Sequence, residues 1–361
     1  MKSEPLNIQG YEDKRILIIN YLCRGIEIMA STMMLGGGEA PTYNSFILEP
    51  NITDRKNLEL FPRKIWRQIE FGQGCIDSLR EQLKKDYVTL LKQMDDLISC
   101  SDIIYIVSHD YLASYPFHVL INKEERYLIE DKVVCYSPSA RMILDLLSEP
   151  VDIPSSDLCL VSGYSGDPSA TEECNGIRGL LNGNGKKAKD DKSVAEVLNE
   201  IKQSNQEWLA VHLVAHGFPK SGARAMESKF KLAEGQEVEA MEWLLGGPRA
   251  AFCSLTICSL QPSMRAGDMF GFPLAILGRG TPSCLMAYCP VIKKSSIQLS
   301  REIYKGIFQD KKSRAEAVTD AIRGMIDGPV TGGGNNQDFS HPANWAPFFF
   351  IGDFRKIYPE S

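Results

Sequence analysis

The chain has 361 residues, of which 43% are hydrophobic and 24% are charged, enough to bury the core of one large or two ordinary α/β domains. This composition excludes a predominantly disordered chain. The formal net charge is -6 and no run of Lys and Arg creates a basic stripe, so we expect no direct binding of nucleic acid.

The N-terminal residues 1–10 are polar and charged where a secretory signal carries an apolar segment, and nowhere do about eighteen apolar residues follow one another. We therefore expect a cytoplasmic protein without a membrane segment. The ten cysteines lack the repeated close spacing of a disulfide framework or a Cys-x-x-Cys zinc site. We expect no metal or other cofactor, and most thiols should be small buried hydrophobic groups.

Apolar runs of strand length alternate with periodic, helix-like segments along the chain. Strands are expected at 15–22, 102–108, 158–163, 210–216, 251–258, 283–288 and 344–351, and 127–136 contains a further β-type stretch; loops are expected at 36–38 and 182–192. Helices are expected at 63–99 with a bend at 72–74, and at 140–147, 193–203, 270–277, 296–308 and 315–326. Strand, helix and strand in succession form the crossover of a parallel sheet, so the order predicts an α/β protein. The Pro- and Ser-containing segment 149–157 predicts a boundary between residues 1–150 and residues 151–361.

Two of the expected strands end in reactive side chains. The run 210–216 ends at His216, and the run 251–258 ends at Cys258. Neighbouring parallel strands bring their last residues together at the carboxyl edge of the sheet, where open α/β sheets keep their sites. An imidazole beside a thiol favours the thiolate, which is the nucleophile. The pair predicts a cysteine peptidase, with the backbone NH groups of Gly217 and Cys258 facing the oxyanion.

Each of these residues also has a structural explanation, as a buried cysteine or a hydrogen-bonded histidine. His212 stands four residues before His216, a zinc-ligand spacing on a helix, but its neighbours favour a strand and no third ligand is evident. Cys253 is a rival nucleophile in the middle of its strand, where a thiol should be buried and unreactive. His109 is a second candidate base, for which we prefer the role of a polar loop residue.

Several ordered motifs carry a family resemblance. They lie at 103–120, 136–139, 211–217 (Val-His-Leu-Val-Ala-His-Gly), 254–258 (Ser-Leu-Thr-Ile-Cys), 341–345 and 351–353. In this order they resemble the CHAT domain, the caspase-like peptidase fold related to separase, and the resemblance runs from about Asp102 to the C-terminus. The chain departs from many relatives after the expected nucleophile, where it has Ser259-Leu260-Gln261 in place of Glu-Thr.

The resemblance implies a caspase-like α/β/α sandwich with a mostly parallel sheet, a supporting or pseudo-protease N-terminal half and a catalytic C-terminal half. It implies that Cys258 is the nucleophile and His216 the general base, with the Gly217 NH in the oxyanion hole. Relatives often stand beside sensors and serve bacterial defence or programmed cell death. We therefore expect a thiol protease of antiviral defence or cell death that cleaves a protein substrate and answers to a separate activator.

The sequence leaves two questions open: which substrate residue precedes the cut, and whether the chain has one of two other functions. An acidic side chain lining the pocket for the residue before the cut would select Lys or Arg. Asp268, after the nucleophile loop, and Asp167, after the strand 158–163, are the candidates; a solvated loop carboxylate is the alternative for each. The chain could instead be a catalytically inactive caspase-like scaffold that binds a protein partner through the same groove. A third function is a thiol hydrolase that transfers acyl groups of a small molecule.

Overall fold

The structure is a computed structural model, and it describes residues 11, 13–24, 27–50, 55–60, 76–150, 154, 156–189, 196, 199, 206–218, 225–258, 271–288, 290–328 and 338–358. Contacts between Cα atoms divide the chain into two compact units. One is Met1–Pro150 with Glu360–Ser361, and the other is Val151–Pro359.

The N-terminal unit contains a mixed sheet in the order β5, β4, β1, β2, β3. The strands are β1 (Arg15–Arg24), β2 (Glu27–Gly36), β3 (Thr42–Leu48), β4 (Ile103–Val107) and β5 (Val133–Tyr136). The β4 strand is parallel to both β1 and β5, whereas β1, β2 and β3 form an antiparallel meander. The helices are α2 (Ile76–Leu90), α3 (Asp95–Ser99), α4 (Leu128–Asp131) and α5 (Ala140–Ser148), with 3-10 turns at Lys92–Met94, Asp110–Leu112 and Phe117–Val119.

The β2 and β3 strands are absent from our sequence prediction, which turned helical after the first strand. On β3 every residue from Thr42 to Ser45 is exposed and only Leu48 is buried, so this edge strand has no buried apolar run to reveal it. The loop predicted at 36–38 is confirmed as the hairpin turn. Its three glycines have positive φ angles, a conformation that side chains other than glycine rarely adopt.

The C-terminal unit contains a mostly parallel sheet, as predicted. Its strands are β6 (Leu158–Gly163), β7 (Lys187–Lys189), β8 (Glu207–Phe218), β9 (Lys229–Ala233), β10 (Gln236–Glu239), β11 (Arg249–Cys258), β12 (Ser283–Ala287) and β13 (Phe348–Gly352). The order β7, β6, β8, β11, β12 is parallel throughout, and β13 closes it antiparallel to β12. The middle of β8 and β11 is buried, because parallel strands are covered on both faces.

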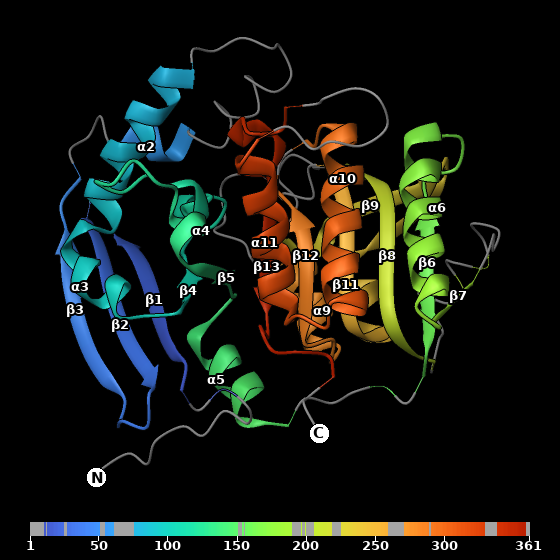
Figure 1. The fold of residues 1–361 in the computed structure, drawn as a ribbon, viewed down its shortest axis with the longest axis horizontal. Coiled ribbons are helices and arrows are strands. Elements are labelled where there is room, and N and C mark those ends of the chain that lie inside the picture. The colour runs from blue at the N-terminus through green and yellow to red at the C-terminus, as the bar shows by residue number, and fades with distance from the viewer. Residues whose placement is uncertain are drawn as a thin grey trace. The chain divides into compact units, whose positions relative to one another are not determined.

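The helices of this unit are α6 (Pro168–Gly183), α8 (Ala240–Gly246), α9 (Phe272–Gly278), α10 (Lys293–Tyr304), which continues as a π-helix (Lys305–Gln309), and α11 (Arg314–Ile326), with 3-10 turns at Ala225–Glu227 and Pro342–Asn344. Figure 1 shows α6, α10 and α11 in front of the strands, and α10 contacts both of the others. Local signals place their ends: Asp167 is the N-cap of α6, and Ser313 forms a capping box with Glu316 at the start of α11.

Some predicted bounds were wrong. The loop expected at 182–192 is in part the end of α6 and in part the short strand β7, and its residues 190–192 lie outside the described residues. The last strand starts at Phe348 rather than at 344, because a 3-10 turn occupies Pro342–Asn344. Of the helix expected at 193–203, only 196 and 199 are described, and both are helical; the segment 63–75 also lies outside the described residues.

A buried ion cluster holds the end of the chain against the sheet. Arg314 donates to the backbone oxygens of Ala251 and Arg355, each at 2.8 Å, and its Nη2 lies 3.0 Å from Oδ2 of Asp353. The Arg355 guanidinium pairs with the same carboxylate at 2.9 Å. Because all three charged side chains are almost fully buried, the cluster ties α11 and the closing segment to β11.

Candidate functional site

The β8 and β11 strands bring the two predicted catalytic residues together in the backbone. The strands are parallel, and in their register the Cα of Cys258 is the partner of the Cα of His216. Cys258 is the last residue of β11, as predicted. The register gives the backbone position of Cys258; its side chain lies outside the described part of the structure.

The prediction that β8 ends at His216 was wrong, because the strand continues to Phe218. On the side of β8 away from β11, the parallel partner β6 ends at Gly163, opposite Val214. Beyond that point β9 takes its place as an antiparallel partner, with His216 opposite Lys231 and Gly217 opposite Phe230. Both residues therefore belong to the strand, and Gly217 is half-buried and pairs with β9 rather than lying in a free loop.

The imidazole of His216 is exposed and lies against one aromatic ring. The centroids of His216 and Tyr164 are 4.3 Å apart and the rings are inclined by 61°. Tyr164 follows directly after β6, and its backbone NH donates to the oxygen of Val214 at 2.7 Å. The contact joins the end of one strand to the candidate base on the next.

Of the two carboxylates predicted to set specificity, Asp167 is described by the structure and Asp268 is not. The Asp167 side chain caps α6 by accepting a hydrogen bond from the Ser169 NH at 2.9 Å, and its Oδ2 lies 2.9 Å from Nζ of Lys293. The bond from Lys293 lowers the pKa of Asp167. Asp167 thus has a structural role that already uses its charge. Asp268 lies outside the described residues.

The three rival residues are not partners in the register of the ends of β8 and β11. Cys253 is fully buried in the middle of β11, and burial raises the pKa of its thiol well above the usual range, so it is unreactive. His109 follows β4 in the N-terminal unit, at the start of a 3-10 turn. His212 is fully buried, and its Nε2 lies 3.3 Å from the Oε1 of Glu173.

Glu173 is a buried charged residue that our sequence reasoning missed. From α6 its Oε1 accepts hydrogen bonds from Thr256 at 3.0 Å and Ser300 at 2.7 Å, and its Oε2 accepts one from Ser296 at 2.7 Å. A signal exists in the sequence, since Glu173 shares the apolar helical face of residues 170, 174, 177 and 181. A carboxylate on such a face predicts a buried partner.

The network keeps this carboxylate charged. Burial raises the pKa of Glu173, but His212 and the two serine hydroxyls outweigh it and bring that pKa below its usual value. The network joins α6, α10, β8 and β11, with Thr256 two residues before Cys258 and His212 four before His216. It therefore holds the two strands together directly below the candidate site.

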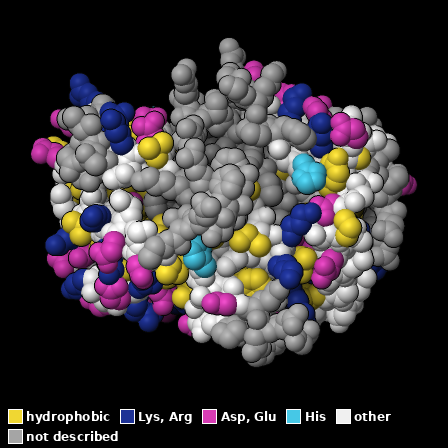
Figure 2. All heavy atoms as spheres, turned by 90° about the horizontal axis from the view of Figure 1, so that it is seen from above, with side chains coloured by type: hydrophobic (Ala, Val, Ile, Leu, Met, Phe, Trp, Pro, Cys, Tyr) yellow, Lys and Arg dark blue, Asp and Glu magenta, His cyan; other side chains and the backbone are white. Residues whose placement is uncertain are grey.

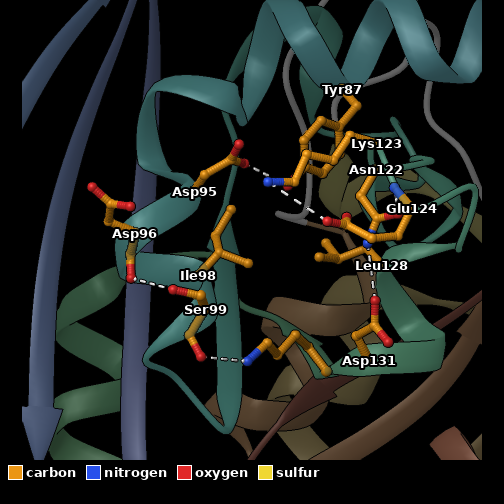
Figure 3. Close-up of a pocket in the computed structure, with 11 residues that line it drawn as sticks. Tyr87, Asp95, Asp96, Ile98, Ser99, Asn122, Lys123, Glu124, Leu128 and Asp131 are labelled. Carbon is orange, nitrogen blue, oxygen red and sulfur yellow. Dashed lines mark hydrogen bonds and ion pairs between the residues drawn. The ribbon is translucent and has the colours of Figure 1, made fainter.

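Two pockets lined by described residues lie elsewhere. One of about 400 Å³ is in the N-terminal unit (Figure 3), where Asp95 accepts the Tyr87 hydroxyl at 2.6 Å and Asp131 accepts from Asn122 at 2.9 Å. Another of about 370 Å³ lies along α10 and α11. Neither is lined by His216 or Cys258.

The described residues show neither a single-sign charged patch on the face in Figure 2 nor a group of metal ligands. Figure 2 shows acidic, basic and apolar side chains intermixed on the described part of one face. Within the described ranges, no three His, Cys, Asp or Glu side chains are grouped as metal ligands. In the same part of the chain, no helix combines the length and the apolar character needed to span a membrane.

The fold is a mixed α/β fold with a mostly parallel sheet, the class of the caspase-like cysteine proteases. Saccharomyces cerevisiae separase, solved in complex with securin, resembles it with a TM-score of 0.54 and 12% identity over 94% of this chain and 30% of that chain. A second structure of that complex has a TM-score of 0.53 and 13% identity, over 96% of this chain and 30% of that chain. The Arg-specific cysteine proteinase gingipain R (RgpB) has a TM-score of 0.48 and 11% identity, over 98% of this chain and 79% of that chain. The chain spans less than a third of the separase chain.

The family follows from the sequence match. The CHAT domain model matches residues 80–353, which is most of the chain, so the chain belongs to the CHAT-domain family. No curated protein sequence matches it.

Proposed function

We propose that the chain is a cysteine endopeptidase in which Cys258 is the nucleophile and His216 the general base. The observation that carries the proposal is the backbone register of β8 and β11, which makes the Cα atoms of these two residues partners. A thiol and an imidazole on adjacent strand positions are the two groups that thiol acyl transfer requires. Membership of the CHAT-domain family supports the same reaction.

The reaction proceeds in two steps. His216 takes the proton of the Cys258 thiol, the sulfur attacks the peptide carbonyl carbon, and the imidazolium gives the proton to the leaving amine as the C–N bond breaks. The product is a thioester on Cys258. His216 then takes a proton from water as its oxygen attacks the thioester carbon, the C–S bond breaks and releases the free acid, and the imidazolium returns the proton to the Cys258 sulfur. The backbone NH groups of Gly217 and Cys258 would donate to the oxyanion in both steps.

Specificity for a basic residue would come from a carboxylate at the substrate pocket. Asp268 is the better candidate, because the charge of Asp167 is already paired with Lys293. A basic substrate residue at Asp167 would have to displace that lysine.

The setting is proposed by analogy with the family. We infer a cytoplasmic endopeptidase that acts in antiviral defence or cell death. It would cleave a protein substrate and respond to a separate activator, and residues 1–150 would form its supporting half. The separase structures contain a protein partner, securin, which fits regulation of such a fold by protein binding. The silent scaffold remains the second candidate.

The test is active-site labelling followed by substrate identification. A peptide library with an electrophilic warhead should label the wild type at residue 258, and Cys258→Ala should abolish the label whereas Cys253→Ala retains it. Fragments made in a lysate by the wild type and not by Cys258→Ala would identify the protein substrate. Protein binding without labelling or fragments would support the scaffold, and turnover of small amides alone would support the small-molecule hydrolase.

A further inference from the structure

The ring of Tyr164 is the described group that lies directly against the imidazole of His216. Their centroids are 4.3 Å apart at 61°, an edge-to-face arrangement slightly closer than the roughly 4.5–7 Å that aromatic pairs usually adopt. His216 is otherwise exposed, and Tyr164 is half-buried. An exposed histidine side chain on a strand has several accessible rotamers, so a rigid neighbour can decide its orientation.

The backbone under Tyr164 is fixed on two sides. Its NH donates to Val214 of β8 at 2.7 Å, two residues before His216, and the NH of Ser165 donates to Leu232 of β9 at 2.8 Å. The segment that begins at Tyr164 thus bridges β8, which carries the candidate base, and β9, which pairs with β8 at that residue. The ring is carried by backbone that hydrogen-bonds to the same strand as His216, so the backbone positions of the two residues are tied to one another.

The other end of this segment is also held. The NH of Asp167 donates to the oxygen of Tyr164 at 3.2 Å, and the Asp167 carboxylate caps α6 and pairs with Lys293 of α10. Gly166 between them has a φ of 86°, which permits the tight turn. Strand ladder, helix cap and ion pair therefore hold the loop in one conformation from both ends.

We infer that Tyr164 is a positioning residue that holds the imidazole of His216 toward the position of Cys258. The inference rests on the proposed function. A base must keep its nitrogen aligned with the proton that it transfers, and a displacement of about 1 Å can lower the rate by about 10²-fold. The Tyr164 ring supplies this alignment by contact, so an aromatic ring is required at 164 and the hydroxyl is not.

The experiment compares Tyr164→Leu, which removes the ring, with Tyr164→Phe, which retains it. With a cleaved peptide as substrate, Tyr164→Leu should lower kcat by about tenfold or more and change KM by less than about threefold. Tyr164→Phe should restore kcat to within about twofold of the wild type. Tyr43→Leu, an exposed tyrosine of the N-terminal unit, is the control for surface replacement. Thermal unfolding of each variant identifies any loss of folded protein.

A second measurement does not need a substrate. The rate at which chloroacetamide alkylates Cys258 at neutral pH reports the thiolate that the imidazole maintains. This rate should fall in Tyr164→Leu and recover in Tyr164→Phe.

The outcomes separate this inference from the proposed function. Equal kcat and equal alkylation in the wild type and Tyr164→Leu would overturn the inference, and so would an increase in KM alone, which would make Tyr164 a substrate contact. A Tyr164→Phe variant as impaired as Tyr164→Leu would overturn it as well. If the wild type cleaves no peptide, the endopeptidase proposal fails, and the alkylation rates still decide whether the ring positions His216.

Discussion

The Cα of His216 is the register partner of the Cα of Cys258 on the neighbouring parallel strand. Adjacent strands lie about 4.8 Å apart, so residues in register are close enough for their functional groups to meet. The pairing extends along β8 and β11 from Glu207 and Arg249 to this last pair, so it is set by the whole ladder. The proposed reaction depends on this one alignment.

Replacement of the base should remove most of the activity. His216→Ala is expected to lower kcat/KM for peptide cleavage by about 10²- to 10⁴-fold, because general base catalysis typically contributes that much. His109→Ala is the matched control, since His109 lies after β4 in the N-terminal unit and should leave the rate unchanged. Steady-state kinetics of both purified variants give the comparison. Equal loss in the two variants would exclude His216 as the specific base.

The two cysteines of β11 should differ in reactivity. Cys253 is fully buried and its pKa is raised by burial, so it stays protonated at neutral pH. Iodoacetamide at pH about 7 should therefore modify Cys258 well before Cys253, by at least about tenfold in rate. Peptide mass mapping over time measures both rates in one sample. Faster modification of Cys253 in the folded protein would contradict the assignment of the nucleophile.

The buried ion cluster should be necessary for stability. In Asp353→Asn the guanidinium groups of Arg314 and Arg355 lose their common carboxylate, and breaking a buried pair costs about 3–5 kcal/mol in free energy of unfolding. Asp320→Asn is the control on α11, because its pairs are exposed and should contribute about 0.5 kcal/mol or less. Urea unfolding gives both values. Similar losses in the two variants would show that the cluster is not specially stabilising.

Stability should depend on pH through Glu173. Its pKa in the folded protein lies below the ordinary value of 4.5, so its contribution is complete above pH 4.5 and is lost as the pH falls through the lower folded-state pKa. Glu173→Gln cannot take up this proton, so its free energy of unfolding should decrease less steeply below pH 4.5. Urea unfolding as a function of pH measures the slopes.

The neighbouring residue supplies the control for this measurement. Glu172 is exposed on the same helix, and Glu172→Gln should follow the wild-type slope. Identical slopes in the wild type and Glu173→Gln would show that the buried carboxylate does not control acid stability.

Cleavage specificity should depend on Asp268 more than on Asp167. Asp268→Ala is expected to abolish cleavage after Lys and Arg, because the pocket would lose its carboxylate. Asp167→Asn should retain that preference and should also retain the cap of α6, because the Asn side-chain oxygen accepts the Ser169 NH about as well as Asp does. Peptide library profiling of both variants decides the point. An unchanged profile in Asp268→Ala would refute its role, and a changed profile in Asp167→Asn would transfer the role there.

Local pattern was sufficient for much of the fold. The strands at β6, β11 and β12 were predicted within one or two residues, because each is a short apolar run bounded by polar or turn residues. The helix predicted at 140–147 is α5, and the side chain of Ser139 caps its start by accepting the Met142 NH. Each of these elements is specified by residues close together in the chain.

Other features depended on segments far apart in the sequence. The extension of β8 beyond His216 needs β9 as a partner, and the burial of Glu173 needs hydroxyl groups from β11 and α10. The edge strand β3 exists by pairing with β2 and carries almost no buried pattern of its own. Such features were missed because the local residue pattern of a segment does not indicate which distant strand or helix it will contact.

The sequence by itself determined that the chain is an α/β protein with a strand ending at Cys258 and a second strand that carries His216. Only the tertiary structure decided that these two positions are register partners and that Tyr164 lies against the imidazole. The physical reason is that a strand's apolar pattern is set by its own burial, whereas its register depends on a partner about forty residues away in the chain.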